Sequence, residues 1–205
     1  MNGDRITLVT PEIYLKALGE TLQMLGVSLA AGSLLGILIG TVLAVTRPGG
    51  VLANRAVQLV LGILVNTIRS LPFIVLLVAI LPFTRFVVGT SIGVWAAIVP
   101  LTVMIAPYIG RLVENSLLEV PQGVIEAARS MGATPLQIFA RFLLPEARGS
   151  LILAITIATV GLIDATAMAG TVGAGGIGDL ALSYGYQRYD GVAMVITSFC
   201  EEAAI

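Results

Sequence analysis

The sequence is poor in charge: only 11% of its 205 residues are Asp, Glu, Lys or Arg, whereas an ordinary soluble domain carries roughly 25%. It is 57% hydrophobic, and its mean hydropathy is +1.00. Water is therefore not its main solvent. The length fits one bundle of about four to six membrane-spanning helices, because each span takes roughly 20 residues, and it leaves no room for a separate soluble enzyme domain.

The sequence also lacks histidine and has one cysteine, Cys200, and one lysine, Lys16. These absences exclude a disulfide framework and a recognisable zinc or iron site. They leave little support for an intramembrane enzyme, which needs a Ser-His, paired-Asp or metal set. A phosphate-binding P-loop ends in Lys-Ser or Lys-Thr, and Lys16 has no such setting, so this chain cannot hydrolyse ATP itself. We expect a non-enzymatic chain without a cofactor of its own.

A net charge of -1 without a basic block argues against nucleic acid as a partner. What the sequence does contain is a series of long apolar runs. A short helix is expected over 11–19, and a glycine-rich, flexible stretch over 173–178, after the fourth run. We predict one transmembrane domain over 1–205, with spans at about 21–46, 54–81, 91–113, 150–170 and an incomplete 191–205, and a polar loop at 114–149.

The last apolar run stops short. Residues 191–200 would form only about 15 Å of helix, half of a membrane crossing. Either a last helix is truncated or this end lies at the surface.

Three glycines in the first run, Gly32, Gly36 and Gly40, recur at every fourth residue. They share one helix face and permit a close approach by another helix. Spacing does not tell whether that neighbour belongs to the same chain or to a second copy.

The distribution of arginine predicts the orientation. Arg47 and Arg55 flank the first turn, and the 111–148 region holds four more arginines; three spans separate the chain's start from that region. The positive-inside rule therefore places both regions in the cytoplasm and the N-terminus outside. The bias is modest because Lys16 and a few arginines fall on the outer side.

The polar loop contains a predicted helical elbow. Pro121 opens a short helix, Gly132 closes it, and Thr134 starts a second one. Apolar residues recur along the first of these helices at three- and four-residue spacing: Val124, Ile125, Ala128 and Met131. This stripe either docks in a groove of another protein or packs back on the ends of the spans.

The same elbow carries Glu126-Ala127-Ala128, then Gly132 four residues later, with Leu-Leu-Pro at 143–145. Together, and between two spans, these residues resemble the EAA loop of permeases in binding-protein-dependent ABC importers. The resemblance implies that the elbow is a coupling helix that docks in a cleft of a separate ATPase. It assigns this role to Glu126, Ala127, Ala128 and Gly132.

A wider match covers most of the chain. Segments 66–73, 88–93, 97–102, 113–119 and 167–176 resemble the methionine importer permeases. The resemblance implies an all-α, five-helix permease of the bacterial inner membrane, working as a homodimer. Its partners would be two copies of an ATPase, which hold ATP and Mg, and a periplasmic or lipoprotein substrate-binding protein. The cargo would be methionine, as the L- or D-isomer, or a related amino acid.

The alternative is a stand-alone secondary transporter or channel, which would place acids or interrupted helices at mid-membrane. Apart from Asp164, no acid lies deep inside a predicted span, and Asp164 lies near the outer end of the fourth run, where contact with periplasmic water is the plainer account. Related permeases more often carry a small neutral residue there, so we give Asp164 no transport role.

Two further residues are candidates for the pathway. Arg69 lies inside the second run, where a lone arginine costs about 2.5–3.5 kcal/mol. It either lines the pathway beside a helix break at Pro72 or snorkels to the inner surface. By resemblance Met168 closes the pathway against the outside, a role that suits a flexible thioether; the alternative is a Met packed between helices.

Overall fold

The computed structural model describes residues 8–50 and 52–202. Within these ranges the protein is helical and contains no strand. The predictions that involve residues 1–7 and 203–205, including the end of the 191–205 run, lie outside the described residues.

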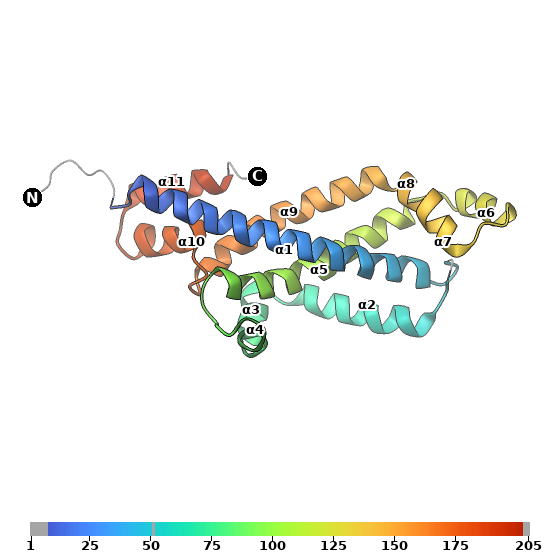
Figure 1. Ribbon diagram of the computed structural model, residues 1–205, viewed down its shortest axis with the longest axis horizontal. Helices are drawn as coiled ribbons and strands as arrows, with labels where there is room; N and C mark the ends of the chain where they lie inside the picture. The colour runs from blue at the N-terminus through green and yellow to red at the C-terminus, as the bar shows by residue number, and fades with distance from the viewer. Residues whose placement is uncertain (1–7, 51, 203–205) are drawn as a thin grey trace, which may run out of the picture. The chain divides into compact units, whose positions relative to one another are not determined.

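The helices follow one another with short connections (Figure 1). They are α1 (Pro11–Thr46), α2 (Arg55–Ser70), α3 (Phe73–Ala79), α4 (Leu81–Val88), α5 (Val94–Leu118), α6 (Gln122–Ser130), α7 (Pro135–Ile138), the π-helical η1 (Phe139–Leu143), α8 (Leu144–Glu146), α9 (Arg148–Gly170), α10 (Gly176–Leu180), the π-helical η2 (Ala181–Tyr186) and α11 (Gly191–Glu202).

The first 36 helical residues form one continuous element, α1 (Figure 1). It begins as predicted at Thr10-Pro11, where the Thr10 carbonyl accepts the amide N–H groups of Ile13 and Tyr14. The expected separate helix over 11–19 is wrong. Nothing breaks the helix there, and Lys16 and Glu20 form an i,i+4 ion pair at 3.8 Å on its surface.

The second predicted run, 54–81, is two helices. Asn54 caps the start of α2, with its side chain accepting the Val57 amide at 3.2 Å. The chain then leaves the helix at Leu71, whose φ and ψ are -80° and 132°, because Pro72 disfavours the helical conformation of the residue before it. The predicted 54–81 span is therefore interrupted at Pro72, where one interpretation of Arg69 placed a helix break.

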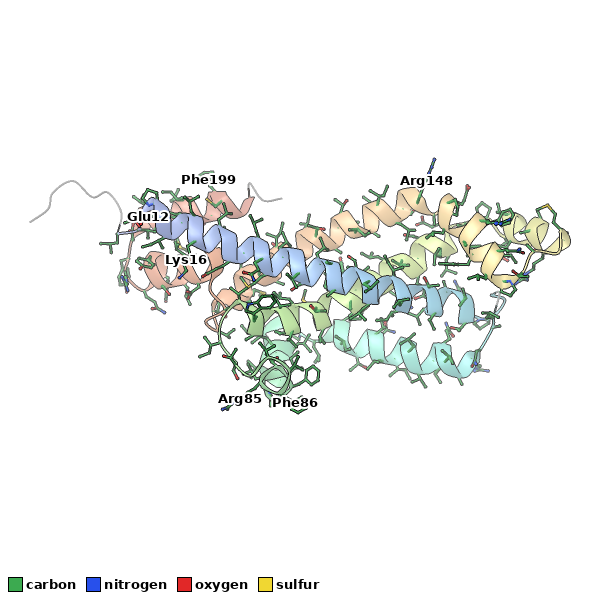
Figure 2. All side chains as sticks on the ribbon, viewed as in Figure 1. Glu12, Lys16, Arg85, Phe86, Arg148 and Phe199 are labelled. Carbon is green, nitrogen blue, oxygen red and sulfur yellow. The ribbon has the colours of Figure 1, made fainter. Side chains whose placement is uncertain are left out.

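Among the described residues, three helices, α1, α5 and α9, are long and apolar enough to cross a membrane, and α2 with α3 is a fourth candidate if the broken pair counts as one span. The helix α11 is shorter. Large apolar side chains project outward from the helices, among them Phe86 on α4 and Phe199 on α11 (Figure 2). An apolar exterior of this kind is what lipid requires.

The helix α5 continues past its predicted end at 113 and reaches Leu118. The charges that marked the start of the polar loop lie inside this helix instead. Arg111 pairs with Glu114 three residues later, at 2.5 Å, and Glu114 is only 4% exposed. The pairing lets both charges remain within a helix that the sequence pattern ended too early.

The chain divides into two compact units, described here one at a time. The first holds the described residues of Met1–Ala30, Pro72–Val103 and Thr159–Ile205, and the second those of Ala31–Leu71 and Met104–Ala158. The long helices α1, α5 and α9 each contribute residues to both units.

In the second unit, α1 and α5 approach each other so closely that their glycines have no room for a side chain. A Cβ at Gly36 would lie 2.7 Å from Ile109, and one at Gly40 would overlap the Gly110 carbonyl oxygen. A Cβ at Gly110 would in turn lie 2.8 Å from Ile39. The glycine face of the first run therefore packs on α5 of the same chain.

In the first unit, α10, η2 and α11 pack together. Buried apolar residues join them to the start of α1: Val9, Ala17, Ile177, Leu180 and Ala193. The glycine-rich stretch, expected to be flexible, is held by specific bonds. The Gly176 amide donates to Glu20 Oε2 and the Ile177 amide donates to Thr21 Oγ1, both at 2.9 Å, and Gly173 accepts from the Gly93 amide.

Candidate functional site

The elbow has the limits that the sequence predicts. Pro121 precedes α6, and Gly132 follows it with φ of +76°, a left-handed conformation that glycine adopts without strain. The Ala133 amide donates to the Ala128 carbonyl at 3.1 Å, which closes the helix end. Thr134 then starts α7 with a capping box, in which its side chain accepts the Gln137 amide.

The two sides of α6 have different surroundings. Ala128 is fully buried, and Val124 and Ile125 are half-buried, so this side packs back on the second unit. Ala127 is exposed, and Met131 is 69% exposed. The apolar stripe is therefore split: its inner part covers the protein's own core, and its outer part is open.

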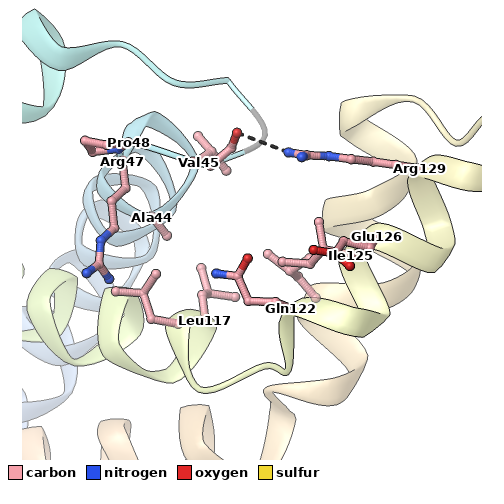
Figure 3. A pocket seen from close by; sticks show the side chains of 13 residues that line it. Ala44, Val45, Arg47, Pro48, Leu117, Gln122, Ile125, Glu126 and Arg129 are labelled. Carbon is pink, nitrogen blue, oxygen red and sulfur yellow. Dashed lines mark hydrogen bonds between the residues drawn. The ribbon is translucent and has the colours of Figure 1, made fainter.

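A hydrogen bond ties the elbow to the turn between α1 and α2. Arg129 Nη2 donates to the Gly50 carbonyl oxygen at 3.1 Å (Figure 3). The turn has no freedom to accept a larger residue at this position, because a Cβ at Gly50 would lie 2.6 Å from the Val45 carbonyl oxygen. No sequence signal points to this bond, since it joins residues 79 positions apart.

Between the elbow, the end of α1 and the end of α5 lies a cavity of about 230 Å³ (Figure 3). Its lining includes polar and charged side chains: Arg47, Gln122, Glu126 and Arg129. Within the described ranges Glu126 has no ion-pair partner inside this chain. The EAA-like glutamate is therefore available to a group from outside the chain.

Arg69 lies in the last turn of α2, directly before the break at Pro72. It is fourteen residues from the start of the helix at Arg55, which is about 21 Å of helix. Its guanidinium lies over the ring of Tyr108, 5.6 Å from the ring centre, an interaction that offsets part of the cost of a charge away from water. The helix break at Pro72 that one interpretation of Arg69 requires is present, and Arg69 itself is exposed.

The second half of α9 exposes one stripe to the surroundings. Asp164 and Met168 are exposed, Met168 to 49%, while the intervening positions face the interior of the first unit. The buried positions are Leu162, Ile163, Ala165, Thr166 and Ala169. Met168 is therefore only about half covered by the described residues of its own chain.

Asp164 belongs to this stripe, four residues before Met168, so their side chains are neighbours on the helix surface. It lies six residues, about 9 Å, from the end of α9. A carboxylate facing hydrocarbon costs about 2.5–3.5 kcal/mol at the centre of a spanning helix. This spacing of four residues is visible in the sequence.

Comparisons with known proteins agree with this geometry. Residues 32–199 match the family described as binding-protein-dependent transport system inner membrane component. The probable D-methionine transport system permease protein MetI of Vibrio cholerae is 50% identical over 186 residues, which is 91% of this chain and 83% of that protein. The corresponding protein of Escherichia coli K12 is 51% identical over 158 residues, 77% of this chain and 73% of its own length.

Solved structures agree as well. A chain of the inward-facing MetNI methionine ABC transporter matches with a TM-score of 0.89 and 46% identity, covering 95% of this chain and 92% of its own. An amino acid ABC transporter, at 18% identity and a TM-score of 0.75, covers 94% of this chain and 89% of its own and shares the fold. The predicted all-α, ABC permease-type fold is confirmed. The chain therefore belongs to the family of binding-protein-dependent transport system inner membrane components.

Proposed function

We propose that this chain is the membrane-spanning permease subunit of an ATP-binding cassette importer that carries methionine across the bacterial inner membrane. The observation that carries the proposal is the match to the MetNI methionine transporter over 95% of this chain at 46% identity. Three apolar helices long enough to span a membrane, with a fourth candidate in the broken pair, support a multi-pass protein.

The working assembly is a homodimer with two copies of a separate ATPase and a periplasmic or lipoprotein substrate-binding protein. ATP and Mg are held by the ATPase, and this chain is not itself an enzyme. The elbow lies in the cytoplasm and the N-terminus lies outside, as the arginine distribution predicts.

The elbow couples ATP hydrolysis to movement of the helices. Glu126 and Ala127 are exposed and contact the ATPase, whereas the fully buried Ala128 fixes α6 to the second unit. Gly132 sets the direction of the chain after α6 through its positive φ. A helix with one buried and one exposed side can pass a push from its partner to the unit on which it packs.

Met168 closes the pathway against the outside, and its exposure on α9 supports this role. Arg69, beside the helix break at Pro72, lines the pathway or supports the break through Tyr108. Methionine suits a gate because its unbranched thioether fills a gap and moves at low cost.

The test is to express the chain in a bacterial membrane, solubilise it gently and identify what co-purifies by mass spectrometry. A Gly132→Glu variant disturbs the elbow, and Gly149→Glu is its matched control, because Gly149 has open space and no positive φ. Recovery of a P-loop ATPase with the original chain and the control, but not with Gly132→Glu, supports the proposal. A stable, folded chain that recovers no ATPase would favour the stand-alone transporter.

Methionine uptake is the second half of the test. Proteoliposomes that contain the recovered complex and its binding protein should accumulate methionine only when ATP is supplied. ATP-dependent uptake of another amino acid in place of methionine would keep the permease assignment and overturn the cargo.

A further inference from the structure

In the first unit, one stripe of α9 consists of the half-buried Gly161, the exposed Asp164 and Met168 and, just past the helix end, the exposed Thr171. The spacing of three, four and three residues places them on one side of the helix. No charged residue of α9 other than Asp164 lies beyond Arg148 at its start. Asp164 is therefore the one charge of this stripe.

Its composition differs from a surface made for lipid. The exposed side chains of α11 show such a surface: Met194, Val195, Ile196 and Phe199 are large and apolar. In contrast, the α9 stripe carries the carboxylate of Asp164, and a charge facing hydrocarbon is costly. The stripe therefore faces water or another polar surface.

We propose that Asp164 faces the substrate passage and binds the ammonium group of the transported amino acid, one helical turn from Met168. This inference rests on the proposed function. Among the described residues no cation pairs with Asp164, so its carboxylate is available. A Cβ built on Gly161 meets no atom within 4 Å, so open space lies beside the carboxylate for a ligand.

Two side chains of this stripe, Asp164 and Met168, each match a different group of an amino acid such as methionine. The carboxylate of Asp164 favours a positive group within about 4–6 Å. The thioether of Met168 lies one turn away and can contact an apolar side chain such as that of methionine. In a homodimer the stripe occurs twice, and two carboxylates across one passage favour a cation between them.

The first experiment measures the charge that a reagent meets beside position 168. The full permease, assembled with its ATPase in liposomes, carries Cys200→Ser to remove the native thiol and Met168→Cys as the labelling site. Labelling rates are compared for a cationic and an anionic methanethiosulfonate reagent. A carboxylate about 6 Å away should favour the cationic reagent about tenfold, because it attracts one reagent and repels the other.

Asp164→Asn should bring the ratio of the two rates close to one. The matched control is Asp179→Asn, which makes the same chemical change in α10, where the carboxylate accepts a hydrogen bond from Ser183; it should leave the ratio unchanged. An unchanged ratio in Asp164→Asn, or a Met168→Cys protein whose new thiol reacts with neither reagent, overturns the inference. If Met168→Cys fails to assemble, Thr171→Cys on the same stripe serves as the labelling site; the preference for the cationic reagent should then be weaker, about fourfold, because the carboxylate lies two helical turns away, and Asp164→Asn should again remove it.

The second experiment measures methionine uptake by the same liposomes with the binding protein. Asp164→Asn should raise the apparent KM at least fivefold, and Asp164→Glu should restore most of it, because it keeps the charge. Normal uptake by Asp164→Asn overturns the ligand role while the proposed function stands. Absence of methionine uptake by the unmodified complex, with the labelling ratio intact, would instead overturn the proposed function and leave Asp164 in a polar passage.

Discussion

The crossing of α1 and α5 and the elbow around α6 both depend on glycine, but for opposite reasons. At the crossing, Gly36 and Gly40 have ordinary helical geometry and no space for a side chain. At the elbow, Gly132 has open space around it but a φ of +76°. The comparison teaches that a glycine can be required for the room it leaves or for the angle it allows, and substitutions distinguish the two.

The largest loss of stability is expected at the crossing of α1 and α5. Gly40→Ala places a methyl group against the Gly110 carbonyl oxygen and 2.7 Å from the Val113 Cβ, and backbone cannot move aside as a side chain can. We expect a loss of about 1–3 kcal/mol in the free energy of unfolding, the usual range for overpacking. Gly26→Ala on the same helix is the control, because nothing lies within 4 Å of its Cβ. Thermal unfolding in detergent measures both; equal midpoints would mean that α1 and α5 do not touch at Gly40.

The next largest effect, on stability and on capture of the ATPase, is expected at the elbow. Gly132→Ala puts a side chain on a left-handed backbone, which costs about 1–2 kcal/mol, and the strain should redirect the chain after α6 and weaken capture of the ATPase. Gly132→Asn should do less harm, since Asn tolerates this conformation. At position 40 we expect the opposite order, with Asn more harmful than Ala, because Asn has the larger side chain and this position lacks room. Pull-down yields that rank Asn below Ala at position 132 would refute the requirement for an angle.

Local signals in the sequence predict the elbow well and the crossing only in part. Pro121, Gly132 and Thr134 each act through their own backbone or nearest amides, so their spacing gives the helix limits directly. The spacing of Gly32, Gly36 and Gly40 predicts a close contact, but one helix cannot name its neighbour. That neighbour, α5, lies about 70 residues further along the chain.

Other features depended on contacts that no local pattern carries. The bond from Arg129 to Gly50 joins distant positions, and its donor looks like any surface arginine. The ion pair of Arg111 with Glu114 kept α5 helical where charge suggested a loop. The break at Leu71 follows from Pro72, a local signal that already suggested a helix break inside the 54–81 span.

A smaller loss of stability is expected at the start of α7, the second helix of the elbow. Thr134→Ala removes the acceptor for the Gln137 amide at the start of α7, which should cost about 1 kcal/mol. Thr134→Ser keeps the hydroxyl oxygen and should retain most of the stability. Hydrogen exchange of the Gln137 amide is the local readout: faster exchange in the Ala variant alone fits the capping box, and equal exchange in all three proteins does not.

The smallest effect has the opposite sign. Gly62 in α2 has helical geometry and nothing within 4 Å of a Cβ, so neither room nor angle requires glycine there. Gly62→Ala should raise the free energy of unfolding by about 0.5–1 kcal/mol, since alanine loses less backbone entropy in a helix. The thermal midpoint of the isolated chain should rise accordingly. If that midpoint rises but the assembled complex becomes less stable, the glycine leaves room for a surface outside this chain, and a third reason for glycine joins the two seen at Gly40 and Gly132.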